Sequence, residues 1–95
     1  FRRIAWLAQD HNVQVVPHGW NTAIGLAADL QISAFLPVAR YVEYLTPCAY
    51  IDELTTEPFR IDEEGCLQIP DAPGLGVQID PDRLKRFCPQ PITFR

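Results

Sequence analysis

The stretch from Val13 to Thr22 constrains the fold of this chain more than any other part of the sequence. Three of its first four residues are valines, and the run ends at Pro17. His18 and Gly19 follow, and a helix signal begins directly after them. A short, nearly continuous apolar run is typical of a strand that is buried on both faces of a parallel sheet. The order of strand, turn and helix therefore favours a parallel α/β architecture, with His18 at the carboxyl end of a strand.

His18 has two interpretations at that position. The carboxyl ends of parallel strands carry the reactive groups of α/β folds, so the imidazole could take part in chemistry. Alternatively, His18 is an ordinary polar residue whose hydrogen bonds are satisfied at a strand end. A neutral imidazole can accept a proton near pH 7. It is too weak a base to remove a proton α to a carboxylate unless a metal ion or hydrogen-bond donors stabilise the product.

Two helices and a second strand are expected in the first half of the chain. Apolar residues at helical spacing predict a helix over 1–10. Asn21 or Thr22 caps a second helix, which runs to about Phe35. Residues 39–45 alternate in the manner of a strand, and the long connection from the first strand indicates a right-handed crossover and parallel pairing.

The second half is richer in proline and less regular. Short strands are expected at 59–61 and 66–69, on either side of a hairpin turn that carries a glycine. Asp80 caps a last helix, which starts with proline and runs to about Phe87. The tail, 88–95, is expected to be irregular.

Glu43 and Trp20 are the other candidates for a functional site. Glu43 lies within an apolar strand, where a carboxylate must find partners or bear a large desolvation cost, unless the strand is an edge strand with Glu43 in water. If the two strands are adjacent and parallel, His18 and Glu43 could face one barrel mouth. Trp20 could form a substrate wall or simply pack. The sequence offers no Asp near His18 to orient it, and the acidic turn at 62–64 is better read as solvated than as a metal site.

Composition excludes several classes of function. The net charge of −4 gives no basic surface for nucleic acid. No apolar run reaches the roughly 18 residues that a membrane span needs, and no signal peptide is visible. Cys48, Cys66 and Cys88 are widely spaced and contain no Cys-x-x-Cys motif, which fits free thiols in a reducing cytoplasm.

Three motifs, in this order, resemble the C-terminal end of the enolase superfamily. They are Val-Val-Pro-His-Gly-Trp at 15–20, Tyr-Val-Glu-Tyr-Leu at 41–45 and Ile-Pro-Asp-Ala-Pro-Gly-Leu-Gly-Val-Gln-Ile-Asp at 69–80. Within that superfamily they are similar to the mandelate racemase-like group, which includes acid-sugar dehydratases. The resemblance runs from Phe1 to about Phe87 and covers about the last quarter of such an enzyme.

This resemblance implies an α/β fold that is the C-terminal fragment of a modified (β/α) TIM barrel. Residues 1–46 would be the last strands and helices of the barrel. Residues 47–95 would be an irregular segment that returns to an α+β capping domain. The first helix lacks an N-cap, so we expect that the chain begins within an element of a longer protein. Its partners would be the rest of the barrel and the capping domain, and the complete enzyme is expected to be a homo-oligomer.

The resemblance also implies roles for the candidate residues. His18 matches the general base or acid on the seventh barrel strand, and Glu43 matches the last-strand Glu that hydrogen-bonds the substrate carboxylate and its enediolate. The Mg²⁺ ligands of relatives lie upstream of these residues. The implied function is Mg²⁺-dependent proton abstraction α to a carboxylate, in an acid-sugar dehydratase, and the isolated chain is expected to be inactive. Alternatives are a racemase or epimerase of the same superfamily, or a non-catalytic interaction module that folds with a partner chain.

Overall fold

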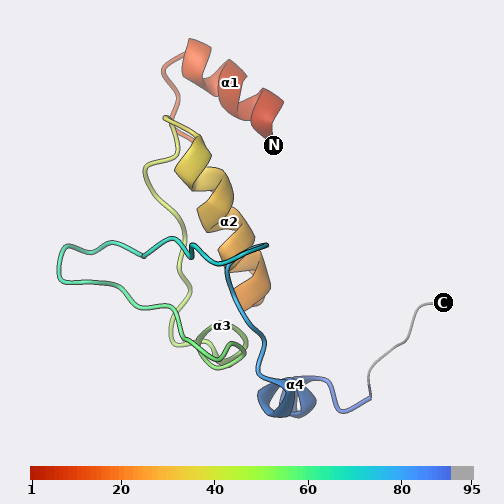
Figure 1. Ribbon diagram of the computed structural model, residues 1–95. Coiled ribbons are helices and arrows are strands. Elements are labelled where there is room, and N and C mark those ends of the chain that lie inside the picture. The colour runs from red at the N-terminus through yellow and green to blue at the C-terminus, as the bar shows by residue number, and fades with distance from the viewer. Residues whose placement is uncertain (91–95) are drawn as a thin grey trace.

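The computed structural model describes residues 1–90 and contains four helices in that range. They are α1 (Arg2–Asp10), α2 (Ala23–Phe35), α3 (Ala49–Asp52) and α4 (Pro81–Phe87). Figure 1 shows α2 near the centre, with α1 at one of its ends and α3 and α4 toward the other. Long segments without helix connect these elements, and the segment that follows α3 extends away from α2 as an open loop (Figure 1).

The three helices expected from the sequence are confirmed, and each of their ends lies within one or two residues of the predicted position. The last helix is capped as expected, because the carboxylate of Asp80 accepts hydrogen bonds from the backbone N–H groups of Asp82 (2.9 Å) and Arg83 (3.1 Å). Thr22 occupies the N-cap position of α2, although its side chain makes no capping hydrogen bond. The four-residue helix α3 was not predicted, since it is too short to show an apolar period.

The two predicted parallel strands are not formed among residues 1–90. Segments 13–16 and 39–45 have no regular secondary structure, and the pairing near them is one hydrogen bond from Val15 N to Val38 O (3.0 Å). The expected burial on both faces is also wrong, because the exposed fractions of Val13 and Val16 are 54% and 45%. A parallel ladder needs successive hydrogen bonds to a neighbouring strand, and the described residues supply too few of them.

The hairpin turn at 62–65 is present, but the strands expected beside it are reduced to an isolated antiparallel bridge between Ile61 and Leu67. Asp62 holds the turn, because its carboxylate accepts hydrogen bonds from the N–H groups of Glu64 (3.0 Å) and Cys66 (2.8 Å). Gly65 adopts φ +80°, a conformation that L side chains rarely take.

The hydrophobic core joins α2 to α3. Leu26 and Leu30 of α2 and Ile51 of α3 are buried together, and burial of each such side chain contributes about 1.5–3 kcal/mol. Partly buried side chains pack against this cluster, namely Val42, Tyr44, Cys48, Phe59 and Leu67. The segment that carries Glu43 is therefore attached to the core through the residues on either side of it.

The C-terminal segment is tied back to the rest of the molecule at several points. Gln31, on α2, donates a hydrogen bond of 2.7 Å to the carbonyl oxygen of Pro70. Thr55 is fully buried and forms an antiparallel bridge with Ile79. Gly76, which has φ +76°, packs closely against Pro70. These contacts keep residues 70–80 against α2 and the segment that follows α3.

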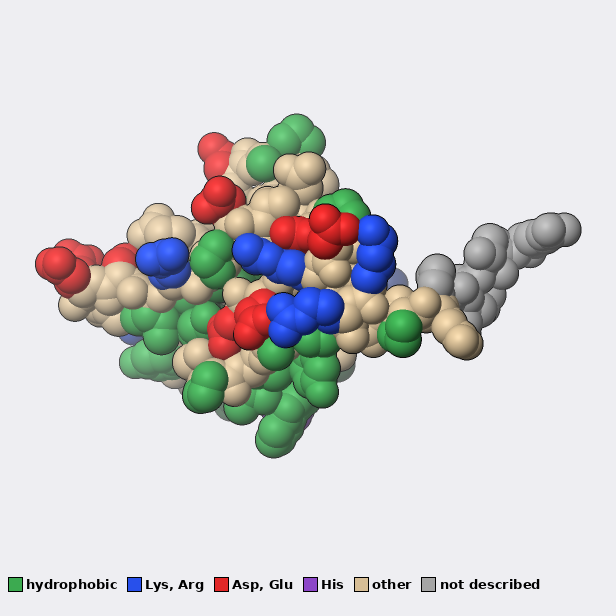
Figure 2. Space-filling view, turned by 90° about the horizontal axis from the view of Figure 1, so that it is seen from below, with side chains coloured by type: hydrophobic (Ala, Val, Ile, Leu, Met, Phe, Trp, Pro, Cys, Tyr) green, Lys and Arg blue, Asp and Glu red, His purple; other side chains and the backbone are tan. Residues whose placement is uncertain are grey.

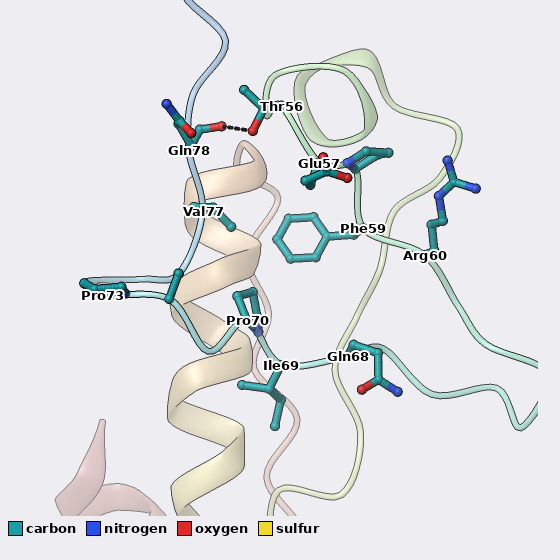
Figure 3. A pocket seen from close by; sticks show the side chains of 13 residues that line it. Thr56, Glu57, Phe59, Arg60, Gln68, Ile69, Pro70, Pro73, Val77 and Gln78 are labelled. Carbon is teal, nitrogen blue, oxygen red and sulfur yellow. Dashed lines mark hydrogen bonds between the residues drawn. The ribbon is translucent and has the colours of Figure 1, made fainter.

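A large open hollow of about 660 Å³ lies between residues 56–60 and 68–78. Figure 3 shows the Phe59 and Val77 side chains pointing toward one another across it, while the hydroxyl of Thr56 contacts the carbonyl of Gln78 (3.4 Å). This hollow shares no lining residue with the pocket that contains His18.

Charged and apolar surfaces are distributed unevenly. On the face seen from the α4 side, acidic and basic side chains alternate (Figure 2), and ion pairs join Lys85 to Asp82 (2.8 Å) and Arg86 to Glu53 (3.0 Å). By contrast, many large apolar side chains are exposed on residues 1–90, including Ile4 (70%) and others at positions 1, 6, 7, 35 and 41. In α1 the apolar stripe predicted from the sequence is thus largely uncovered by the described residues.

No helix within residues 1–90 has the length and apolar character needed to cross a bilayer. Residues 88–90 lie in neither a helix nor a strand, in keeping with the irregular tail that was predicted, and 91–95 lie outside the described residues.

Candidate active site

The side chains of His18 and Glu43 meet directly, through a hydrogen bond between His18 Nδ1 and Glu43 Oε2. His18 belongs to the turn before α2, and Glu43 to the irregular segment after it. Both line an open pocket of about 370 Å³, together with Gly19, Trp20, Tyr44 and Leu45. The two side chains are 67% and 55% exposed, so the described residues form one wall of this pocket and leave its other side open. The expected meeting of the two candidates is thus present in the structure.

The contact fixes the orientation of the imidazole ring. An ionised carboxylate can only accept hydrogen bonds, so in the pair with ionised Glu43 it is His18 Nδ1 that carries the proton. The other ring nitrogen, Nε2, is then the one that can accept a proton. This arrangement can transfer a proton at Nε2 while the carboxyl group holds the ring in place.

Trp20 lies at the edge of the same pocket with an exposed fraction of 75%. Within residues 1–90 little of the Trp20 side chain is packed, and the choice between a packed residue and a substrate wall stays open. A broad aromatic surface at the rim of a pocket can cover the apolar face of a ligand, so its role as a substrate wall stays a prediction.

Asp29 is an acidic group near His18 that the sequence analysis missed. It lies on α2, and a Cβ atom at Gly19 would come within 2.5 Å of Asp29 Oδ2. Burial raises the pKa of Asp29 above its ordinary value, and the nearby His18 opposes only part of this rise. Gly25 lies one turn before Asp29 on α2. A Cβ at Gly25 would collide with Asn21, so both glycines make room for polar side chains around this turn.

The described residues do not fit a Mg²⁺ site. No three side chains of His, Cys, Asp or Glu within 1–90 are grouped so that they could hold a metal ion. In the acidic turn, the carboxylate of Asp62 is occupied by hydrogen bonds from the turn itself. The bond from Cys66 N lowers the pKa of Asp62, and burial raises it. The bonds from the Gln68 side chain and from Glu64 N lower the pKa further, so that it lies below its usual value. No chemical step of this chain is therefore assigned to a metal.

Curated relatives match most of this chain. It is 39% identical over 95 residues to D-galactarolactone cycloisomerase from Agrobacterium fabrum, in an alignment that covers 90% of this chain and 25% of that enzyme. It is 32% identical over 85 residues to D-xylonate dehydratase from Haloferax volcanii, which covers 88% of this chain and 20% of that enzyme. The chain thus spans a quarter or less of the length of these relatives.

Solved structures of similar proteins share the fold. The 3,6-anhydro-D-galactonate cycloisomerase from Zobellia galactanivorans has a TM-score of 0.71 and 39% identity, over 90% of this chain and 24% of that one. A mandelate racemase/muconate lactonizing enzyme from a Sulfitobacter species has a TM-score of 0.75 and 28% identity, over 90% and 21%. The part of each structure that matches this chain has the fold of the C-terminal, TIM-barrel domain of enolases. Because the family model described as enolase C-terminal domain-like matches residues 1–83, the chain belongs to that family of the enolase superfamily.

Proposed function

We propose that this chain is the C-terminal part of an enzyme that removes a proton α to the carboxylate of an acid sugar. The observation that carries the proposal is the hydrogen bond between His18 and Glu43 in one open pocket. In this proposal residues 1–46 are the last part of the barrel, and residues 47–95 return to a capping domain. The enzyme acts in the cytoplasm, as a homo-oligomer.

His18 is the proton-transfer group in this proposal. Its Nε2 takes the proton from the α carbon, the electron pair of the broken C–H bond moves into the carboxylate, and an enediolate forms. In a dehydration, the hydroxyl on the β carbon then leaves as water after it receives a proton, which His18 can deliver. The resulting enol becomes a ketone as it gains a proton at carbon and loses the proton of its hydroxyl group. Positioned proton transfer of this kind contributes about 10²–10⁴-fold to rate.

Glu43 and Trp20 bind the substrate. In this role Glu43 is protonated and donates a hydrogen bond to the substrate carboxylate and to the enediolate that grows from it, because an ionised carboxylate could only accept. Trp20 covers one side of the sugar chain. Both residues line the pocket beside His18, so a small carboxylate could reach all three. Members of the superfamily are expected to use Mg²⁺. The metal ligands in this proposal come from polypeptide outside this chain, in the rest of the barrel.

Dehydration and cycloisomerisation are the two reaction outcomes that the relatives favour. The 39% identical relatives are named as cycloisomerases of galactarolactone and of 3,6-anhydro-galactonate, and a 32% identical relative is named as a dehydratase of xylonate. Both outcomes begin from a carboxylate-stabilised intermediate, so one His and one Glu can serve either. Racemisation or epimerisation is a third outcome of the same proton transfer. A non-catalytic interaction module would not require His18 and Glu43 to share a pocket.

The proposal is tested with the full-length polypeptide that carries this segment. It is incubated with Mg²⁺ in D₂O against a panel of aldonates, aldarates and their lactones, and the products are followed by mass spectrometry and proton NMR. Apart from deuterium taken up from the solvent, loss of the mass of water indicates dehydration. A product with the composition of the substrate indicates cycloisomerisation or epimerisation, which the NMR spectrum distinguishes, and deuterium at the α carbon indicates proton abstraction. Absence of turnover and of α-proton exchange across the panel would overturn the proposal.

A further inference from the structure

The carboxylate of Asp52, at the end of α3, collects three hydrogen bonds from the segment that follows Glu43. The hydroxyl of Tyr44 donates to Oδ1 (2.7 Å), the hydroxyl of Thr46 donates to Oδ2 (3.2 Å), and the backbone N–H of Cys48 donates to Oδ2 (2.7 Å). One side chain thus holds residues 44 to 48 in a single arrangement relative to α3.

Tyr44 connects this network to the candidate active site. It follows Glu43 directly and lines the same pocket. Its ring packs against the core cluster of α2 and α3, and its hydroxyl lies within reach of the carbonyl of Phe59 (3.2 Å) as well as of Asp52. The Tyr44 side chain is therefore held by the packing of its ring and by the hydrogen bonds of its hydroxyl. The Glu43 side chain, by contrast, is more than half exposed and contacts His18.

The charge state of Asp52 strengthens the network. Burial raises the pKa of Asp52, but hydrogen bonds from Cys48 N, Tyr44 and Thr46 outweigh burial and leave the pKa below its usual value. Burial and the hydrogen bond to Asp52 raise the pKa of Tyr44. Asp52 is thus an ionised acceptor and Tyr44 a neutral donor near neutral pH, and hydrogen bonds to an ionised acceptor are about twice as strong as those between neutral groups.

We infer that Asp52 is a positioning residue, which holds the backbone at Tyr44 so that the Glu43 carboxyl group faces His18 and the substrate. This inference rests on the role proposed for Glu43 and extends it to a residue that does not touch the substrate. Misplacement of a reacting group by about 1 Å can lower a rate by about 100-fold, so a group that fixes the backbone beside Glu43 influences catalysis from a distance.

The test is a double-mutant cycle in the full-length polypeptide that carries this segment, assayed on the substrate found by the panel above. The variants are Asp52→Asn, Glu43→Gln and both together, with Glu53→Gln as the matched control. Glu53 is adjacent in sequence, is exposed and pairs with Arg86 rather than with the segment after Glu43. Asp52→Asn is expected to lower kcat/KM by about 10- to 100-fold, and Glu53→Gln to leave it unchanged.

The cycle separates positioning from general support of the fold. If Asp52 acts through Glu43, Asp52→Asn costs little further activity once Glu43→Gln is present, because residues that act together are not additive. Losses that add in the double variant, or an Asp52→Asn enzyme with unchanged kcat/KM, would overturn the inference. If Asp52→Asn does not fold, Tyr44→Phe removes one hydrogen bond of the network and is used in the same cycle. An unchanged rate in Glu43→Gln alone would instead overturn the proposed function.

Discussion

His18 and Glu43 are 25 positions apart in the sequence, and their side chains form a direct hydrogen bond. The helix α2 carries the chain away from His18, and the segment that follows α2 runs back alongside the helix to Glu43. The imidazole and the carboxyl group therefore act on one another before any substrate arrives.

Replacing His18 by Asn should lower kcat by about 10²–10⁴ in the full-length polypeptide, because the amide cannot take up a proton. Steady-state rates measure the loss, and circular dichroism shows that the fold is retained. His11→Asn is the matched control, since His11 lies exposed in the turn after α1. A rate like that of the wild type in His18→Asn would remove His18 from the mechanism.

The isolated 95-residue chain should show no turnover of acid sugars. His18 and Glu43 form one wall of an open pocket, and within residues 1–90 no group of side chains can hold a metal ion. The measurement is α-proton exchange in D₂O with Mg²⁺, read by proton NMR on the same panel of carboxylates. Exchange above that of the buffer would contradict this prediction.

Gly76→Ala should destabilise the protein more than Gly74→Ala. Both glycines have a positive φ, near +75°, so either substitution strains the backbone by about 1–2 kcal/mol. A Cβ at Gly76 would also lie 2.5 Å from the Cβ of Pro70 and 2.9 Å from its carbonyl, whereas a Cβ at Gly74 meets nothing within 4 Å. Thermal unfolding of the full-length variants gives the comparison. Equal losses of Tm in the two would show that the turn relaxes around Gly76.

Gln31→Leu should loosen the C-terminal segment from α2. It removes the hydrogen bond of 2.7 Å to Pro70 O, which is worth about 0.5–1.5 kcal/mol. Hydrogen exchange of the amides in 70–79 should become faster, and exchange in α4 should change less, because α4 is held by its own cap. Gln9→Leu on the exposed part of α1 is the control. Unchanged exchange in 70–79 would mean that other contacts hold this segment.

The stability of the protein should depend on acid through Asp52. Its pKa in the folded state lies below the ordinary value of 3.8, so the folded state binds fewer protons than the unfolded state. The stability that Asp52 contributes is therefore complete above about pH 3.8 and is lost as the pH falls through the lower, folded-state pKa. Asp52→Asn should flatten the fall in Tm below this pH, whereas Glu53→Gln serves as the control. An unaltered acid profile in Asp52→Asn would contradict this expectation.

Helix α4 shows how much of the fold could be predicted from local sequence. Asp80 and Pro81 fix its start through a carboxylate that meets free N–H groups and a ring that needs none. Both effects act within one turn, so neighbouring residues suffice to predict them. The same holds for the acidic turn at 62–65. His18 and Glu43 meet as predicted, although the parallel strands from which the meeting was predicted are not formed among residues 1–90, and the roles of both residues in catalysis stay a prediction.

The parts that could not be predicted depend on contacts that no simple sequence period reveals. Segments 13–16 and 39–45 have strand-like sequences, but a ladder requires hydrogen-bonding partners that the described residues provide only at Val15. The short helix α3 depends on the carboxylate of Asp52 accepting from Cys48 N, which no apolar period reveals. Asp29 lies against the backbone of Gly19, next to His18, where a Cβ atom would collide with its carboxylate. In each case, the deciding contact becomes visible only in the folded structure.

The exposed apolar side chains of α1 limit how the coding region of this chain could be transferred between genes. Ile4 and Leu7 are exposed at 70% and 60%, and a surface of this kind calls for a complementary surface on other polypeptide. Recombination that moves the coding region of this segment into another gene would succeed where the receiving protein offers a matching surface. The segment is therefore expected to have diverged together with its surroundings, as one evolutionary unit, rather than to have been exchanged between enzymes as an independent module.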